Sequence, residues 1–332
     1  MRALVTGVGG FLGQVLARQL LERGDEVRGF GRGDYPQLSR LGVELVRGDL
    51  RDRDAVMAAC RDRNVVYHVG GVAGIWGSWA HFYAPNVLGT QHVVAGCHAH
   101  GVSRLVYTSS PSVTFDGVDQ VNVGQDAGYA RRWLCHYPHS KALAEQWVLA
   151  HHDPSRLLTC ALRPHLIWGP GDQHLIPRLM DRARRGKLKR VGDGRNQIDT
   201  IYVDNAASAH VLACDALQPG ARVGGRAYFI SQGEPVNCWE WIDQLLALTG
   251  LPPVRRHVSA RIAWSAGTVL EGIYRVLRRS GEPPMTRFLA AQLSTSHYFD
   301  LTPARTDFGY EPTISLAEGM RRLASERTKM AP

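Results

Sequence analysis

A glycine-rich turn near the start of the chain restricts the fold more than any other feature of the sequence. Ala3–Thr6 has the apolar character of a buried strand, and Gly7, Gly10 and Gly13 follow it with GxxGxxG spacing before an amphipathic stretch begins. Glycine adopts the backbone angles of a tight turn and lets a pyrophosphate approach the main chain at a helix N-terminus. A strand, a glycine turn and a helix in this order predict a dinucleotide-binding unit, rather than a turn that only packs a helix on a strand.

The first two-thirds of the chain alternates short apolar runs with longer amphipathic stretches. The expected strands are Ala3–Thr6, Glu26–Gly31, Val43–Arg47, Val65–His68, Arg104–Thr108 and Leu158–Leu162. The expected helices, in which apolar residues recur at three and four positions, are Gly10–Arg23, Asp52–Cys60, Phe82–His100 and Tyr137–Ala150. The alternation predicts an α/β fold with a doubly wound parallel sheet of the Rossmann type.

Beyond about Pro164 the pattern becomes mostly helical, with helical stretches near 174–185, 205–217, 237–249 and 259–279. Short strands are expected near Ile198–Val203 and Tyr228–Ser231. We therefore expect a cofactor-binding Rossmann domain over residues 1–163, to which residues 197–218 return, and a smaller, mostly helical substrate-binding lobe over residues 164–332.

The end of the second expected strand bears on the choice between NADP and NAD. An acidic residue there would bind the ribose 2′-hydroxyl of NAD, whereas an arginine suits the 2′-phosphate of NADP. Arg32 stands at this position, which favours NADP(H), while Asp34 two residues later keeps NAD(H) open as the less favoured cofactor. Asp49 follows the third strand, where it could accept from the adenine amino group or cap the helix that begins near Arg51.

A tyrosine and a lysine four residues apart begin the helix over 137–150. Tyr137 and Lys141 therefore project from one face of that helix, and Ser109 and Ser110 end the preceding strand at the ligand-binding edge of the sheet. A nearby ammonium can lower the pKa of a phenol toward neutrality, and a serine hydroxyl can hold a substrate oxygen. Ser110, Tyr137 and Lys141 are thus the candidate catalytic residues for interconverting a ketone and a secondary alcohol.

The sequence resembles the extended short-chain dehydrogenases over nearly its whole length. The motifs that carry the resemblance are Asn86-Val87-Leu88-Gly89-Thr90, Tyr107-Thr108-Ser109-Ser110, Arg163-Pro164-His165-Leu166-Ile167-Trp168-Gly169-Pro170, Tyr202-Val203-Asp204-Asn205-Ala206 and Pro284-Met285-Thr286-Arg287-Phe288. Within that family they are most similar to the 3β-hydroxysteroid dehydrogenase group, which includes the 2-alkyl-3-oxoalkanoate reductases of bacterial olefin synthesis. Steroid and sterol enzymes usually carry an acid in place of Arg32, which favours NADPH-dependent reduction of an oxoalkanoate.

The resemblance also implies the residues that contact each ligand. Those expected at the cofactor are Gly7, Gly10, Phe11, Leu12, Gly13, Arg32, Asp49, Leu50, Val69, Gly70, Gly71, Tyr137, Lys141, Pro164 and Leu166. Those expected at the substrate are Trp76, Ser112, His165, Trp168, His174, Leu270 and Ile273. A steroid or sterol 3β-dehydrogenase, a nucleotide-sugar epimerase and a cofactor-binding sensor without catalysis are the alternative functions.

Apolar residues recur with helical spacing from Ile262 to Leu277, and arginines gather near the end of this stretch. One interpretation is a flap, carried by Leu270 and Ile273, that closes over an elongated apolar substrate and touches a membrane through its basic end. The other is a helix packed in the core of the smaller lobe. The two interpretations differ in what the apolar face contacts, and helical periodicity does not distinguish between them.

Composition excludes several other classes. The net charge of +9 comes from scattered residues without a basic repeat, so we expect no nucleic-acid partner. No metal is expected, because His92, His98 and His100 lack ligand spacing. The six cysteines form no CxxC pair and no apolar run reaches about 18 residues, which predicts a cytoplasmic location, with peripheral membrane contact as an alternative. A hydrophobic small molecule is the expected partner, and a pathway enzyme or a second copy of the chain are further candidates.

Overall fold

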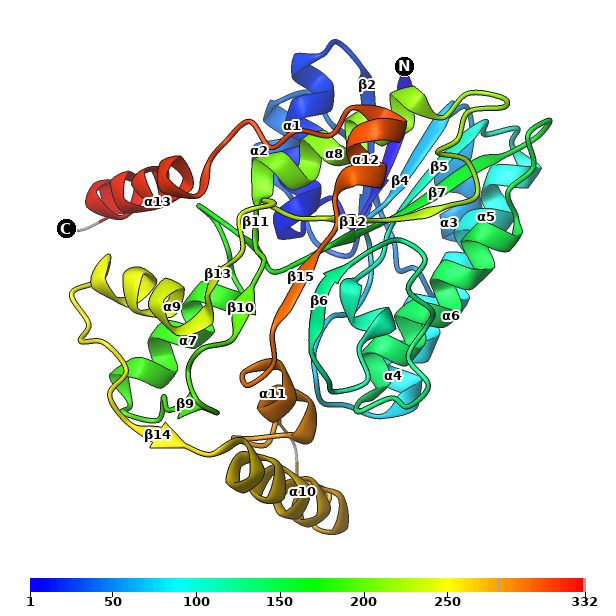
Figure 1. Cartoon of the computed structure of the whole chain (residues 1–332). Coiled ribbons are helices and arrows are strands. Elements are labelled where there is room, and N and C mark those ends of the chain that lie inside the picture. Colours follow the sequence, from blue (N-terminus) through cyan, green and yellow to red (C-terminus); the bar gives the residue numbers. More distant parts are fainter. Residues whose placement is uncertain (280, 331–332) are drawn as a thin grey trace.

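A seven-stranded parallel sheet runs through the molecule, as the alternation of segments predicts (Figure 1). The computed structural model describes residues 1–279 and 281–330. The strands are β1 (Arg2–Thr6), β2 (Glu26–Gly31), β3 (Glu44–Arg47), β4 (Val65–His68), β5 (Arg104–Thr108), β7 (Leu158–Pro164) and β12 (Ala227–Ile230). Their spatial order is β12-β7-β5-β4-β1-β2-β3, so the direction of winding reverses between β1 and β4.

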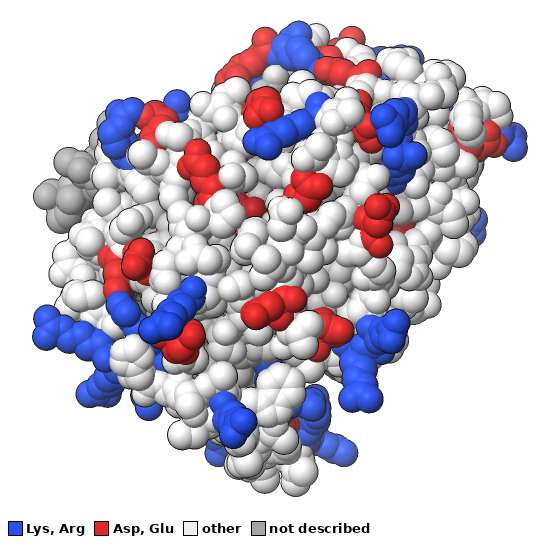
Figure 2. Space-filling model, viewed as in Figure 1, with Lys and Arg blue, Asp and Glu red and all other residues white. Residues whose placement is uncertain are grey.

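The remaining elements form a second region below and to the left of the main sheet in Figure 1. Its strands are β6 (Gln120–Val123), β8 (Ile167–Trp168), β9 (Arg190–Val191), β10 (Gln197–Ile198), β11 (Ile201–Tyr202), β13 (Val236–Asn237), β14 (His257–Val258) and β15 (His297–Phe299). Its helices are α7 (Leu175–Arg184), α9 (Cys238–Ala247), α10 (Ala260–Val276), α11 (Arg287–Gln292) and α13 (Leu316–Met330). Acidic and basic side chains are mixed over most of the visible face, whereas basic side chains dominate its lower edge, where α10 lies (Figure 2).

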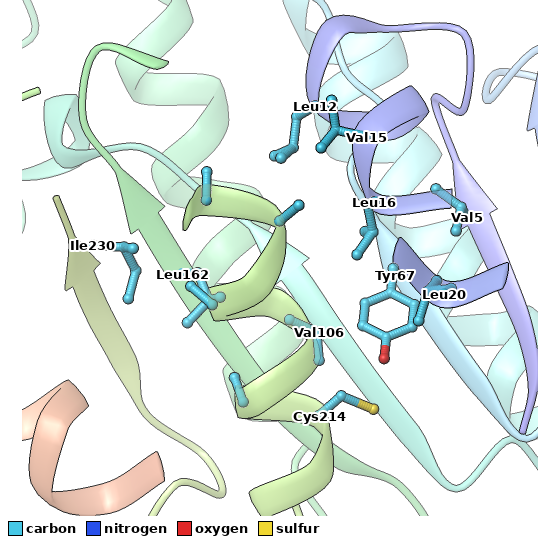
Figure 3. Close-up of a cluster of buried hydrophobic side chains, with 14 of the residues drawn as sticks. Val5, Leu12, Val15, Leu16, Leu20, Tyr67, Val106, Leu162, Cys214 and Ile230 are labelled. Carbon is cyan, nitrogen blue, oxygen red and sulfur yellow. The ribbon is translucent and has the colours of Figure 1, made fainter. Parts of the chain in front are cut away.

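Helices cover both faces of the main sheet because successive strand residues point to opposite sides. In β1, Ala3 and Val5 face a cluster formed with α1 (Phe11–Glu22), α2 (Pro36–Arg40), α8 (Val203–Ala216) and α12 (Thr302–Phe308), part of which is drawn in Figure 3. Leu4 faces the other cluster, formed with α3 (Arg53–Cys60), α5 (Gly89–Ala99) and α6 (His136–Ala150). The doubly wound arrangement is therefore confirmed.

The expected helix over 82–100 contains an irregular turn. It begins as α4 (Trp79–Tyr83), passes through the single π-helical turn η1 (Ala84–Leu88) and continues as α5. Pro85 lies inside η1 and lacks the N–H that a regular helix would use. The wider turn places Asn86 on the inner side, where it is buried.

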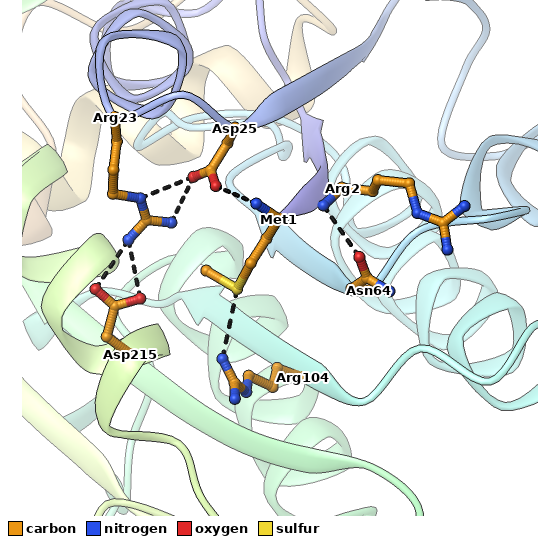
Figure 4. A network of polar contacts seen from close by, with 7 residues as sticks. All are labelled: Met1, Arg2, Arg23, Asp25, Asn64, Arg104 and Asp215. Carbon is orange, nitrogen blue, oxygen red and sulfur yellow. Dashed lines mark hydrogen bonds and ion pairs between the residues drawn. The ribbon is translucent and has the colours of Figure 1, made fainter.

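Polar contacts fix the start of β1 at the edge of the sheet away from the glycine turn (Figure 4). The α-amino group of Met1 pairs with Asp25, while Arg23 binds Asp25 at 2.5 Å and Asp215 at 2.8 Å. Arg23 follows α1 and Asp215 lies in α8, so this network joins both helices to the first strand.

Candidate active site

The carboxyl ends of β1 and β4 form the crevice at which open α/β sheets bind ligands. Gly7 directly follows β1 with a φ of +68°, and a Cβ atom on it would lie 2.6 Å from the Cα atom of Gly70, which lies just after β4. A Cβ atom on Gly13 would lie 2.3 Å from the carbonyl oxygen of Gly7. These two positions admit only glycine, because the turn and α1 pack directly on backbone.

The beginning of α1 has the properties of a phosphate site. Its N-cap residue Gly10 supplies no side-chain cap, and its first turn carries no acidic residue. The N–H groups of that turn and the positive end of the helix dipole therefore face the crevice without a competing side chain. The turn fits the pyrophosphate of a dinucleotide.

Arg32 directly follows β2 and is exposed, as expected for a side chain that would meet a 2′-phosphate. Asp34, the acid that would favour NAD, is 3.9 Å from the guanidinium of Arg47. Tyr35, which the sequence analysis missed, packs over the glycine turn: a Cβ atom on Gly9 would lie 1.9 Å from its ring. A lone tyrosine after a strand gives no signal of such a contact.

Asp49 does not cap the third helix. Its carboxylate accepts from the backbone N–H of Arg51 at 2.9 Å and from the guanidinium of Arg51 at 2.8 Å, and these bonds lower the pKa of Asp49. Asp52 is the N-cap of α3, since its carboxylate accepts from Ala55 N–H at 3.1 Å. The capping role considered for Asp49 is wrong, because α3 begins at Arg53 and Asp52 is the residue that directly precedes it. Leu50 packs against Gly70: a Cβ atom added to Gly70 would lie 3.0 Å from the Cδ1 atom of Leu50.

A chain of buried polar side chains lies beneath the crevice and connects β1 to α6. His68 binds the hydroxyl of Thr6 at 2.7 Å through Nδ1 and that of Thr90 at 2.9 Å through Nε2. The Thr90 hydroxyl donates to the carbonyl of Asn86, so His68 must donate through Nε2 and accept at Nδ1. Burial lowers the pKa of His68 to about 3, which keeps the ring neutral. The Asn86 amide then donates to Ser140 at 3.0 Å.

Asn86 also supports the loop that follows β4. Its side chain accepts from Val72 N–H at 2.7 Å and donates to the carbonyl of Val72 at 3.0 Å. The sequence resemblance marked Asn86, but His68 carried no signal. The two residues hold the loop over the crevice in a defined position.

Ser110, Tyr137 and Lys141 converge at the carboxyl end of β5. Ser110 is the N-cap residue of the 3-10 helix η2 (Pro111–Thr114), and its hydroxyl lies 2.8 Å from that of Ser112. Tyr137 and Lys141 lie one turn apart near the beginning of α6. The ammonium of Lys141 is buried and donates to the carbonyl of Thr108 at 2.5 Å.

The two titratable groups of this trio have shifted pKa values. Burial raises the pKa of Tyr137, and a hydrogen bond with Ser110 partly opposes the shift. Burial lowers the pKa of Lys141 to about 7. The expected lowering of the Tyr137 pKa by Lys141 is not present, because the ammonium is directed at the Thr108 carbonyl and burial disfavours its charge. Tyr137 is therefore protonated at neutral pH, which is the form that can donate a proton.

Two cavities meet at this trio. The first, of 300 Å³, is lined by Phe11, Leu12, Val69, Gly71, Ser110, Tyr137, Lys141, Pro164, Leu166 and His174, among others. The second, of 180 Å³, is lined by Ile75, Ser110, Ser112, Phe115, Tyr137, Pro164, His165, Leu166, Phe288 and Phe299, among others. Ser110 and Tyr137 thus border both spaces. His174, expected at the substrate, borders the first cavity instead.

The polar wall of the second cavity is a pair of buried histidines. His165 Nε2 lies 2.7 Å from His297 Nδ1, and His297 Nε2 lies 2.9 Å from the carbonyl oxygen of Gln292. That carbonyl can only accept, so each ring donates through Nε2. Burial lowers the pKa of both imidazoles, and the second cavity is consequently lined by uncharged groups. Sequence reasoning missed His297 because 132 residues separate it from His165.

A third, larger cavity of 760 Å³ lies beyond Ile75, which lines both it and the second cavity. Its walls include Trp76, Trp133, Leu134, His136, Tyr274, Arg275, Arg278 and Arg279. Trp76 lines this third cavity and not the second, which Tyr137 borders. A substrate carbon that reacts at Tyr137 would therefore not contact Trp76.

Three expected substrate residues lie elsewhere. Trp168 is fully buried in the core of the smaller lobe, where its Nε1 donates to Thr200 at 3.2 Å. Leu270 and Ile273 lie on α10 but line none of the three cavities. The helix instead faces the protein with Gly267, which lies against the backbone of Arg287, while Ile273 is 41% exposed and Leu270 is half-buried.

Two further features of the described chain concern metal binding and membrane-spanning helices. Within residues 1–279 and 281–330, no cluster of His, Cys, Asp or Glu side chains is arranged to hold a metal ion. In the same part of the chain, no helix is both long enough and apolar enough to cross a membrane.

Comparison with known proteins agrees with this geometry. Residues 4–258 match the 3-beta hydroxysteroid dehydrogenase/isomerase family. The chain is 52% identical to the 2-alkyl-3-oxoalkanoate reductase of Stenotrophomonas maltophilia, with 97% of this chain and 98% of that protein aligned. It is 34% identical to the mouse sterol-4-alpha-carboxylate 3-dehydrogenase, decarboxylating, over 97% of this chain and 89% of the other. A solved structure of MoeE5 with UDP-glucose and NAD superposes with a TM-score of 0.75, at 26% identity and full coverage of both chains.

Proposed function

The chain belongs to the 3-beta hydroxysteroid dehydrogenase/isomerase family of NAD(P)-dependent oxidoreductases, and on that premise we propose that it reduces the 3-oxo group of a long-chain 2-alkyl-3-oxoalkanoate with NADPH. One observation carries the proposal. Tyr137 and Ser110 stand between a cavity beside the glycine turn and a cavity lined by uncharged groups, several of them aromatic. A hydride donor and an apolar ketone can therefore approach the same hydroxyl groups from opposite sides.

Each member of the trio has a distinct task in this reaction. Tyr137, held protonated by burial, donates its proton to the oxygen of the ketone as negative charge develops there. Ser110 holds that oxygen by a hydrogen bond. Lys141, whose pKa of about 7 allows an ammonium near neutral pH, binds the nicotinamide ribose and replaces the proton of Tyr137. NADPH supplies the hydride when it is bound.

The residues around the glycine turn would hold the cofactor. Gly7, Gly10 and Gly13 let the pyrophosphate approach the start of α1, and Arg32 would pair with the 2′-phosphate. Of the remaining expected residues, Val69, Gly71, Pro164 and Leu166 line the first cavity, and we propose that Asp49, Leu50 and Gly70 complete the cofactor site.

We assign the second and third cavities to the two alkyl chains of the substrate. The second cavity, at 180 Å³, has room for a short segment only, whereas the third has 760 Å³. Ile75 stands between them, so the longer chain passes this side chain on its way to Trp76 and Trp133. The cofactor then lies in the Rossmann domain, to which we assign residues 1–163 and 197–218 and to whose sheet β12 also belongs, and the substrate lies against the lobe formed mainly by residues 164–332, which β6 also joins.

The proposal is tested with purified protein and three candidate substrate classes. Because 3-oxo acids lose carbon dioxide readily, the assay runs in the oxidative direction, with NADP⁺ or NAD⁺ and a long-chain 2-alkyl-3-hydroxyalkanoate, a 3β-hydroxysteroid or UDP-glucose. We expect turnover of the hydroxyalkanoate with NADP⁺ at the highest kcat/KM. Preference for the steroid or for UDP-glucose would overturn the substrate assignment.

The role of Tyr137 is tested in the same assay with Tyr137→Phe. Removing the hydroxyl should abolish nearly all turnover and leave cofactor binding unchanged, because the glycine turn is untouched. Tyr298→Phe is the matched control, since Tyr298 also loses a hydroxyl but lines none of the three cavities. Activity of Tyr137→Phe within tenfold of the parent would exclude the proposed role.

A further inference from the structure

The second cavity suits a ketone, but it offers no cation to an acid. The polar side chains that line it are Ser110, Ser112, Gln120, Tyr137, His165, Gln292 and His297. No lysine or arginine among the described residues lines this cavity. A carboxylate that entered it without a proton would be an unpaired buried charge, which is very costly in free energy.

A 2-alkyl-3-oxoalkanoate must nevertheless place its carboxyl group close to the trio. A single carbon atom separates the carboxyl carbon from the reacting carbon, whose oxygen Ser110 and Tyr137 would hold. The first cavity is assigned to the cofactor, and the ammonium of Lys141 there donates to the carbonyl of Thr108. The arginines of the third cavity lie beyond Ile75. The second cavity is therefore the space left for the carboxyl group.

His165 can bind a carboxyl group and a proton together. The residue lines the second cavity and is only 7% exposed. Its Nε2 atom donates to Nδ1 of His297 at 2.7 Å, and Nε2 of His297 donates to the carbonyl of Gln292 at 2.9 Å. This order of donors leaves Nδ1 of His165 without a proton. Within residues 1–279 and 281–330 no group donates to that atom, so its lone pair remains for a ligand.

We propose that His165 binds the carboxyl group of the substrate through Nδ1, and that one proton from the solvent enters the site with that group. The proton lies between Nδ1 and a carboxyl oxygen, so the carboxylate, the two imidazoles and the added proton are together uncharged. His297 is a positioning residue, because it fixes the His165 ring through Nε2. The inference rests on the proposed function and names the group that distinguishes a 3-oxo acid from a neutral ketone.

Other charges around the pair do not supply the missing cation. The titratable or charged side chains on the surrounding elements are Tyr137 on α6, Asp119 before β6, Arg163 on β7, Asp199 after β10 and Arg287 on α11. Arg163 and Arg287 are each bound by a glutamate. Burial lowers the pKa of His297, and Asp119 opposes this shift only in part. The pair is therefore uncharged before the acid binds, and the proton is taken up on binding.

The first test counts the protons taken up when an acid binds the full chain in complex with NADPH. The probes are 2-hexyl-3-hydroxydecanoate and its methyl ester, which do not react there because both the alcohol and the cofactor are already reduced. Calorimetric titration at about pH 7 in phosphate and in Tris, two buffers that differ in ionisation enthalpy, gives the number of protons. We expect uptake of about one proton with the acid and none with the ester. Binding of the acid without proton uptake would overturn the inference.

The second test measures the Kd of both probes from about pH 6 to about pH 8, above the ordinary pKa of a carboxylic acid. The Kd of the acid should rise about tenfold per pH unit, because one proton must bind with each acid molecule. The Kd of the ester should stay nearly constant. An acid whose Kd does not change with pH binds as an anion, which would contradict the assignment to His165.

Two histidine variants separate His165 from other groups that titrate in this range. In His165→Asn the side-chain amide can donate to a carboxylate without a proton from the solvent, so the rise in Kd with pH should flatten. Lys141, whose pKa is about 7, is the same in both proteins, and its contribution cancels in the comparison. His152→Asn is the matched control, since His152 is half-buried and lines none of the three cavities. An unchanged rise in His165→Asn would exclude His165 as the partner of the proton.

Turnover of the two probes with NADP⁺ is assayed separately, so that the proposed function and this inference fail in different ways. Oxidation of the acid, together with binding that takes up no proton, would overturn this inference alone. Binding and oxidation of neither probe would overturn the substrate assignment and this inference with it. The proton count on the parent protein decides the matter even where His165→Asn does not fold, because it needs no variant.

Discussion

At the scale of single residues, burial and charge compete most directly at Lys141. The side chain is 5% exposed, and its pKa falls to about 7 from near 10.4 in an unfolded chain. Between these two values the unfolded state binds more protons than the folded state, so the free energy of unfolding rises with pH. Below pH 7 both states carry the charge, and the folded protein bears its full desolvation cost.

This sign leads to a prediction for Lys141→Met, measured by urea unfolding without cofactor. The variant should be more stable than the parent at pH 6, by an amount of the order of a few kcal/mol. The difference should shrink by about 1.4 kcal/mol per unit as the pH rises from 7 toward 10. Lys187→Met, on an exposed side chain, should show no such trend. A pH-independent difference for Lys141→Met would contradict the lowered pKa.

Arg32 carries the second prediction at this scale. Arg32→Ala should weaken NADPH binding by about 1.5–3 kcal/mol, the range for hydrogen bonds to charged groups, and leave NADH binding nearly unchanged. Isothermal titration with both cofactors measures the two losses, and Arg40→Ala at the end of α2 is the control. Equal losses for NADPH and NADH would refute selection by Arg32, and a loss of NADH binding in Asp34→Ala would point to the competing carboxylate.

At the scale of elements, α6 is joined to β7 by a buried ion pair. Glu145 and Arg163 are almost inaccessible, and the guanidinium donates two hydrogen bonds, at 3.0 and 2.6 Å. Tyr129 donates a further bond to Glu145 at 2.8 Å. The pair holds the helix that carries Tyr137 and Lys141 against the central sheet, which positions the trio.

Glu145→Ala should lower the free energy of unfolding by about 3–5 kcal/mol, because it leaves the Arg163 charge buried without a partner. Replacing both residues by methionine should recover much of that loss, since the charge leaves with its counter-ion. Urea unfolding of the two variants provides the comparison. A double variant no more stable than Glu145→Ala would show that the loss arises from packing rather than from the charge.

At the scale of the whole molecule, the substrate space lies between the main sheet and the smaller lobe. Ile75 comes from the loop after β4, while Phe288 and Phe299 come from α11 and β15. The position of Ile75 between the second and third cavities thus depends on how these distant segments pack together.

Ile75→Trp should narrow the passage between the second and third cavities. If four methylene groups can no longer enter, about 3 kcal/mol of apolar burial is lost, which is a factor of roughly 150 in kcat/KM. Short-chain substrates should be affected little. The pair Leu270→Ser, Ile273→Ser should leave the dependence on chain length unchanged, because those side chains line neither cavity. A uniform loss over all chain lengths for Ile75→Trp would exclude the passage.

Local patterns in the sequence were sufficient for the sheet, the glycine turn and the close approach of Ser110, Tyr137 and Lys141. Helical and strand periods, and the angles that only glycine adopts, depend on neighbouring residues. The rule that ligands bind at the carboxyl ends of parallel strands then brings distant motifs to one edge. For this reason the expected strands of the first 163 residues agree closely with β1 to β5 and β7.

Only the tertiary structure decided what the helical faces and buried polar groups contact. Periodicity identified the apolar face of α10, but the packing of Gly267 against the chain at Arg287 turned that face to the solvent. The bonds of His68 with Thr6 and Thr90, the pairing of His165 with His297 and the burial of Trp168 likewise join residues far apart in the sequence. Such contacts depend on how whole elements dock, and no local pattern of residues specifies that docking.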